Sequence, residues 1–142
     1  MKKSKKVVWI VIPTWNRHND LIECLDSLSQ VTYHPLEILV IDNASNDGSV
    51  DSVVKLFPYV NVIRLPENLG APRASNIGFE HALRKGANYI LRLDSDTIVS
   101  PGFLEPLVKK AAASGLDLAF MAGIPGTLGG AVAGNSGSSG SW

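Results

Sequence analysis

The chain has 142 residues, enough for one domain of ordinary size. Its 13 basic and 13 acidic side chains give a formal net charge of zero, which excludes nucleic-acid binding driven by bulk positive charge. Its single cysteine, Cys24, allows no internal disulfide, so the chain suits a reducing compartment and we expect a cytoplasmic location.

Strands and helices are predicted to alternate along the chain. The apolar run 7–12 predicts a first strand, and leucines spaced i, i+4, i+7 over 21–28 predict a helix after it. The same signals predict further strands at 36–41, 60–65 and 89–93, and further helices around 50–57, 74–85 and 104–111. Nearly continuous apolar strands are typical of parallel sheets. The pattern therefore predicts an α/β fold, a three-layer α/β/α sandwich with a mostly parallel sheet.

A polar segment follows each predicted strand. These segments are 13–17, 42–48, 66–70 and 94–96. Ligands of open α/β sheets bind beyond the carboxyl ends of the strands, so we expect the four segments to meet at one edge. Each one alone also reads as an ordinary solvated turn or helix cap, and it is their combination that favours a binding site.

The triplet Asp94-Ser95-Asp96 closes the fourth predicted strand. Carboxylates near a core must be paired, hydrogen-bonded or bound to a metal. Hard divalent cations such as Mg²⁺ or Mn²⁺ take oxygen ligands and keep positions for water and phosphate oxygens. The triplet therefore predicts a metal that holds a phosphorylated substrate, and the alternative is a turn with solvated acids.

Four segments in this order resemble the motifs of family 2 glycosyltransferases with the GT-A fold. They are Val11–Arg17, Val40–Ser49, Glu67–Gly70 with Arg73–Gly78, and Leu93–Thr97. The resemblance covers roughly residues 6–110. It implies a Rossmann-like, nucleotide-binding half of the GT-A fold and transfer of a sugar from a nucleotide-diphosphate donor to an acceptor hydroxyl. It favours UDP- or dTDP-sugar donors and Mg²⁺ or Mn²⁺ as cofactor, and it leaves the acceptor, glycan or lipid, open.

The resemblance also implies roles for residues after the first two strands. Pro13, Thr14 and Asn16 would shape the pocket for the base and ribose. Asp42 would accept hydrogen bonds from the nucleoside, a role suited to an acceptor-only group. Arg17 would pair with a phosphate or be a solvated cation near a helix start.

The later segments supply the implied diphosphate and metal contacts. The nucleotide side would be lined by Asn68, Gly70, Arg73 and Asn76. Among these, Arg73 suits the diphosphate because its planar fork matches phosphate oxygens. Asp94 would face the donor ribose or the metal, and Asp96 would ligate the metal, which neutralises the departing diphosphate.

The sequence departs from the family pattern after the metal motif. Inverting members carry a carboxylate base in a later segment, where it deprotonates the acceptor hydroxyl. After Asp117 this sequence contains no Asp, Glu, His, Lys or Arg. We therefore identify no catalytic residue, and we expect the acceptor half to be missing and sugar transfer by this chain to be weak or absent.

The last segment has a different character. We divide the chain into an incomplete nucleotide-sugar-binding domain, 1–112, and a Gly/Ser-rich tail, 113–142, foreign to the family pattern. Residues 115–142 resemble the flavin pyrophosphate loop of UDP-N-acetylenolpyruvoylglucosamine reductases. The uncharged stretch 118–134 is short and rich in glycine for a membrane span, so no membrane association is predicted. Two alternatives to a glycosyltransferase donor domain stay open: a non-catalytic nucleotide-binding module and a fragment of an FAD-binding reductase.

Overall fold

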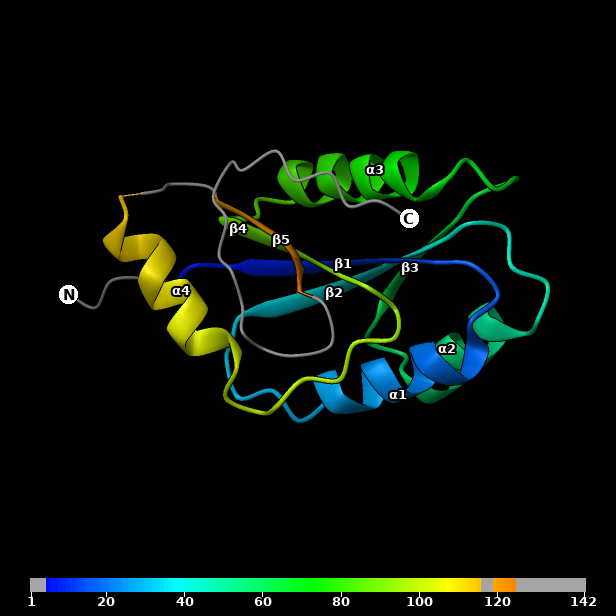
Figure 1. The fold of residues 1–142 in the computed structure, drawn as a ribbon, viewed down its shortest axis with the longest axis horizontal. Coiled ribbons are helices and arrows are strands. Elements are labelled where there is room, and N and C mark those ends of the chain that lie inside the picture. Colours follow the sequence, from blue (N-terminus) through cyan, green and yellow to red (C-terminus); the bar gives the residue numbers. More distant parts are fainter. Residues whose placement is uncertain (1–4, 116–118, 125–142) are drawn as a thin grey trace.

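The computed structural model describes residues 5–115 and 119–124 and contains one sheet with helices on both faces (Figure 1). The elements follow in the order β1 (Val8–Thr14), α1 (His18–Leu28), β2 (Leu36–Asp42), α2 (Ser49–Leu56), β3 (Asn61–Arg64), α3 (Ala71–Arg84), β4 (Tyr89–Leu93), α4 (Leu104–Ala113) and β5 (Ala119–Ile124). This alternation confirms the predicted fold class.

The strands of the described residues form one parallel sheet with the order β3-β2-β1-β4-β5. The chain moves outward from β1 to β3 and then returns through α3 to β4 on the other side of β1. This reversal creates a topological switch point between β1 and β4, where open α/β sheets bind ligands. The strand pairing is consistent with an opening at this point, because β1 stays paired with β2 as far as Thr14, whereas its pairing with β4 ends at Val11.

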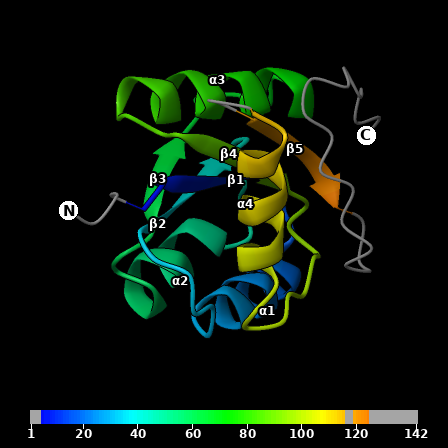
Figure 2. The same ribbon diagram turned by 90° about the vertical axis from the view of Figure 1, so that its left-hand side faces the viewer.

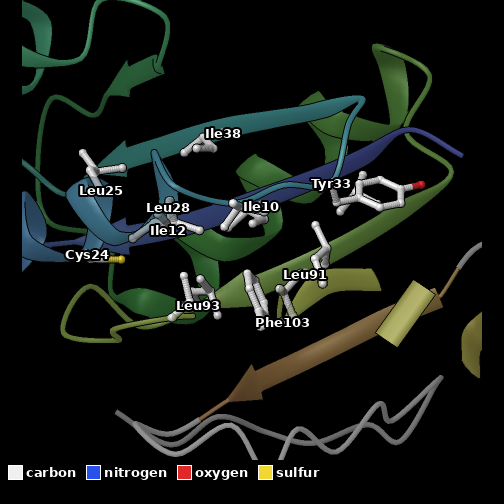
Figure 3. Close-up of a cluster of buried hydrophobic side chains, with 14 of the residues drawn as sticks. Ile10, Ile12, Cys24, Leu25, Leu28, Tyr33, Ile38, Leu91, Leu93 and Phe103 are labelled. Atoms are coloured by element: carbon white, nitrogen blue, oxygen red, sulfur yellow. The ribbon is translucent and has the colours of Figure 1, made fainter. Parts of the chain in front are cut away.

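Each face of the sheet is covered by helices that bury an apolar stripe. One face lies against α1 and α2, and the opposite face lies against α3 (Figure 2). The apolar side chains of α4 join the cluster on the face that α1 and α2 cover. In the larger cluster, Cys24 and Leu28 of α1 lie with Ile12 of β1 and Leu93 of β4 (Figure 3). Every residue of β1 is buried, which explains its continuous apolar run.

The helix α3 approaches the sheet closely because its buried face consists of small residues. They are Ala71, Ala74, Ser75, Gly78 and Ala82. A Cβ atom at Gly78 would lie 2.4 Å from Cγ1 of Val11 and 3.2 Å from Cγ1 of Ile41. The missing side chain at Gly78 therefore sets the distance between α3 and the centre of the sheet.

Replacing Gly78 with alanine is expected to lower the free energy of unfolding by about 1–2 kcal/mol. Alanine gains up to about 1 kcal/mol of helix propensity, but overpacking against the buried, branched Val11 costs about 1–3 kcal/mol. Urea unfolding measures the difference. Gly102→Ala, in the turn before α4, is the control for adding a Cβ without overpacking, because a Cβ at Gly102 would have no neighbour within 4 Å. Equal losses in the two variants would contradict this account of the packing.

The predicted strands and helices are all present, with small shifts at their ends. The third helix is predicted from residue 74, whereas α3 begins at Ala71 because Pro72 is tolerated in a first helical turn. The sequence does not predict β5, which lies in the segment assigned to the tail and pairs with β4. Residues 125–142, which hold most of the flavin-like segment, lie outside the described residues. Among the helices that the structure describes, none combines the length and apolar character needed to cross a bilayer.

Candidate nucleotide-binding site

The loops that follow β1 and β2 are joined by hydrogen bonds. The N–H of Asn16 donates to Oγ of Ser45 at 2.8 Å, and Oδ1 of Asn16 accepts the N–H of Asn46 at 2.8 Å. Asn16 has a φ of 48°, in the left-handed region that asparagine adopts more readily than most residues. In this structure Asn16 therefore fixes one loop against the other and shapes the rim of the sheet.

Two buried polar side chains lie next to each other at this rim, and each carries one oxygen without a hydrogen-bond partner among the described residues. Thr14 and Asp42 are neighbours in the register of β1 and β2, and they are 2% and 0% exposed. Oδ2 of Asp42 accepts the N–H of Ser45 at 3.1 Å and lies 4.0 Å from Nε of Arg64. Within the described residues, Oδ1 of Asp42 and Oγ1 of Thr14 have no hydrogen-bond partner. Such an unsatisfied group costs about 1–3 kcal/mol, so the pair indicates a site that a polar ligand would complete.

The carboxylate of Asp47 connects the first turns of two helices. Its Oδ2 accepts the N–H of His18 at 3.0 Å, and its Oδ1 accepts the N–H of Ser49 at 3.1 Å and the hydroxyl of the same serine. Burial raises the pKa of Asp47, but the hydrogen bonds from Ser49 and His18 outweigh it and hold the pKa below its usual value. Asp47 thus acts as a shared cap that sets α1 and α2 side by side.

Replacing Asp47 with alanine is expected to lower the free energy of unfolding by about 1 kcal/mol at neutral pH, the usual cost of a lost cap. Because the pKa is lowered in the folded state, this stabilisation is present above the unfolded-state pKa. It is lost as the pH falls through the folded-state pKa. Urea unfolding at decreasing pH should show that the difference in unfolding free energy between the variant and the unmodified chain becomes smaller in the acidic range. Asp26→Ala, at an exposed position late in α1, is the control. A loss of unfolding free energy in Asp47→Ala that stayed constant in acid would contradict the capping role.

A hollow of about 550 Å³ lies at the start of α1. Its lining includes Trp15, Arg17, Asp20 and Asp47. Trp15 is 52% exposed, and Arg17 pairs with Asp20 at 3.3 Å. Exposed aromatic faces stack on nucleic-acid bases, so Trp15 is a candidate contact that our sequence reasoning omitted. The available signal was a tryptophan placed in a polar loop at a strand end.

The loop between β3 and α3 turns onto the same edge. Oδ1 of Asn68 accepts the N–H of Gly70 at 2.9 Å, and Oδ1 of Asn43 accepts the N–H of Leu69 at 3.0 Å. Gly70 has a φ of 85°, which a residue with a side chain rarely adopts. Asn68 and Gly70 therefore shape the start of α3, which carries two exposed polar residues of the predicted set, Arg73 and Asn76.

The predicted metal-binding pair lies in the turn after β4. Asp96 is exposed, and its side chain has no hydrogen bond or ion pair within the described residues. Oδ1 of Asp94 lies 3.4 Å from Nη2 of Arg92. Among the described residues there is no group of three or more His, Cys, Asp or Glu side chains that could hold a metal ion. Two carboxylates fit Mg²⁺ or Mn²⁺, which bind through one or two carboxylates and complete their shell with water and phosphate oxygens.

Cys24 is a core residue beside this turn and not a ligand. Its Sγ lies 4.0 Å from the backbone oxygen of Asp94, within the apolar cluster of Figure 3. Burial, together with the charges of Asp96 and Asp94, raises the pKa of the Cys24 thiol to about 12. The thiol therefore stays protonated at neutral pH, whereas metal binding needs the thiolate.

The predicted site residues lie along the carboxyl edge of the sheet: at the ends of β1 and β2, in the loops that follow the strands, and in the first half of α3. Figure 1 shows this edge of the sheet on its right-hand side. Pro13 is buried in β1 just beyond the point where pairing with β4 ends. The roles of these residues remain predictions. Sequence reasoning did not identify four residues that the structure adds to this region: Trp15, Asp47, Arg64 and Arg92.

The chain matches a family model described as "Glycosyl transferase family 2" over residues 9–130, a range that runs through β5. It is 33% identical over 122 residues to a protein of Escherichia coli K12 described as "uncharacterized glycosyltransferase YibD", covering 84% of this chain and 34% of that one. It is 30% identical over 116 residues to the glycosyltransferase GlyG of Streptococcus pneumoniae, covering 80% and 38%. The chain therefore spans about a third of the length of these relatives.

Solved structures of similar fold contain nucleotides. The mannosyltransferase PcManGT of Pyrobaculum calidifontis, in complex with GDP-Man and Mn²⁺, has a TM-score of 0.65 at 26% identity. That match covers 74% of this chain and 32% of the other. S. aureus TarS, residues 1–349 in complex with UDP, has a TM-score of 0.63 at 27% identity and covers 77% and 31%.

Proposed function

Since this chain belongs to glycosyl transferase family 2, we propose that it binds a nucleotide-diphosphate sugar together with a divalent metal, as the donor-binding part of a glycosyltransferase. The sugar would pass from this donor to an acceptor hydroxyl. The observation that carries the proposal is the buried pair of unpartnered groups on Thr14 and Asp42 at the β1 and β2 ends. Family membership and the nucleotide complexes of similar structures support it.

The chemistry of this pair favours a uracil or thymine base. The Asp42 carboxylate can only accept hydrogen bonds, and the imide N–H of uracil or thymine is a suitable donor. The hydroxyl of Thr14 can donate to the neighbouring carbonyl oxygen. Trp15, exposed at the same rim, would stack on the base face. A TarS structure with UDP supports this base class, whereas PcManGT with GDP-Man makes guanosine the competitor to test.

The diphosphate and metal would lie between α3 and the turn after β4. Arg73 would contact the diphosphate, and Asp96, with Asp94, would hold Mg²⁺ or Mn²⁺. The metal, when bound, supplies Lewis-acid stabilisation of the charge on the leaving nucleotide diphosphate. The exposed carboxylate of Asp96 and the Mn²⁺ in PcManGT support this assignment.

We further propose that sugar transfer by this chain alone is weak or absent. Residues 118–142 contain no ionisable side chain that could deprotonate an acceptor hydroxyl. The relatives are about three times as long as the matched segment, so an acceptor-binding part is expected elsewhere in such proteins.

The test is a calorimetric titration of UDP, dTDP, GDP and CDP, each with and without Mn²⁺. We expect UDP and dTDP to bind more tightly than GDP and CDP, and Mn²⁺ to strengthen binding by at least about 100-fold, or about 2.8 kcal/mol. The fluorescence of Trp15 should change on binding, and Trp15→Phe should remove that change. Absence of binding by every nucleotide under both conditions would refute the proposed function.

A further inference from the structure

Arg92 is a buried cation with partners on two different elements. Its side chain is 11% exposed, on the face of β4 that lies against α3. Nε of Arg92 donates to Oγ of Ser75 at 3.0 Å, and Nη2 lies 3.4 Å from Oδ1 of Asp94. Burial lowers the pKa of Arg92 and the charge of Asp94 raises it, but a guanidinium keeps its proton at any pH in ordinary use. A charge this deeply buried must be paired or hydrogen-bonded, and Asp94 and Ser75 provide these two contacts.

These contacts connect two parts of the proposed site. Ser75 is buried in α3, between the exposed Arg73 and Asn76. Asp94 begins the turn that carries Asp96. Oδ2 of Asp94 has no hydrogen bond within the described residues, so the ion pair with Arg92 leaves one oxygen of this carboxylate to a ligand.

We propose that Arg92 is a positioning residue that fixes Asp94 against α3, so that the metal-binding turn and the diphosphate-binding helix keep one relative geometry. The inference rests on the proposed function above. Arg92 itself is too enclosed to be a principal phosphate ligand, and the exposed Arg73 is better placed for that role. Because Arg92 acts through Asp94, its loss should weaken the response to metal while nucleoside recognition at Thr14 and Asp42 persists.

The experiment measures UDP affinity with and without Mn²⁺ and takes the ratio of the two dissociation constants. Ser75→Ala and Arg92→Met are expected to reduce this ratio by about tenfold, the usual effect of losing a group that orients a metal ligand. UDP affinity without metal should change by less than about twofold on the same reasoning. Arg92→Lys should give an intermediate ratio, because it keeps the charge and loses the bond to Ser75. Ser75→Ala in the Arg92→Met background should cause no further loss, because both changes break one link.

The matched control is Ser52→Ala, another helical serine whose Oγ contacts a basic side chain of a different element, at 2.7 Å from Nε2 of His18. In Ser52→Ala, the ratio of the UDP dissociation constants without and with Mn²⁺ should be the same as in the unmodified chain. If Arg92→Met fails to fold, the Ser75→Ala result alone decides. Equal losses with and without Mn²⁺, or additive losses in the double variant, would overturn this inference while the unmodified chain still bound UDP. An unmodified chain that bound no nucleotide would overturn the proposed function, and this inference with it.

Discussion

Replacing Asp96 with alanine is expected to remove most of the Mn²⁺-dependent part of UDP binding. We expect the dissociation constant in Mn²⁺ to rise about 100-fold, which corresponds to about 2.8 kcal/mol. Asp96 exposes a carboxylate that no described residue engages, so its removal takes a full charge from the proposed metal shell without breaking a bond within the fold. Calorimetry at saturating Mn²⁺, repeated in chelator, measures the effect.

Two controls separate the metal from general charge effects. Glu105→Ala removes an exposed carboxylate from the first turn of α4, and it should leave the response to Mn²⁺ unchanged. UDP binding in chelator should be equal for Asp96→Ala and the unmodified chain, because the base contacts do not involve this residue. A full response to Mn²⁺ in Asp96→Ala would show that the metal, if any, is held elsewhere.

The gross fold and the edge that carries the site follow from the sequence for a simple physical reason. Strands buried on both faces appear as apolar runs, and parallel strands bring all their carboxyl ends to one side. Thus the positions of Thr14, Asp42 and Asp96 at one edge could be predicted without knowing the strand order. The switch point between β1 and β4 could not be predicted, because it depends on which strands pair with each other in the sheet.

Other features escaped prediction because they depend on tertiary partners. The short strand β5 lies between a charged residue and a glycine-rich run, so its sequence carries only a weak strand signal. Its pairing with β4 stabilises the extended conformation. Asp47 reads as a cap of α2 alone, since its bond to His18 spans 29 positions. Arg92 reads as an interruption of an apolar strand, and only the packing of α3 reveals Ser75 as its partner.

The buried carboxylate of Asp42 links stability and recognition. Its closest cation is the exposed Arg64, at 4.0 Å, and its Oδ1 has no partner in the described part of the chain. Burying a charge with so little compensation is costly, so a neutral replacement of the same shape should not destabilise the free protein. We therefore expect the Asp42 carboxylate to strengthen ligand binding while it lowers the stability of the protein without ligand.

Asp42→Asn tests this directly, because it keeps the shape and converts an acceptor into a donor. The new amide N–H would oppose the imide N–H of uracil, and UDP affinity should fall by about 10- to 150-fold, since a hydrogen bond to a charged group contributes about 1.5–3 kcal/mol. The same amide suits N3 of cytosine, which accepts a hydrogen bond, while Oγ1 of Thr14 can accept from the cytosine amino group. CDP affinity should therefore rise while UDP affinity falls.

Asp42→Ala completes the comparison, since it should weaken UDP without improving CDP. Thermal unfolding of the free proteins should show Asp42→Asn at or above the melting temperature of the unmodified chain. An Asp42→Asn variant that bound UDP as tightly as before would mean that the base does not contact this carboxylate. In that case the buried, unpartnered oxygen would need an explanation within the fold itself.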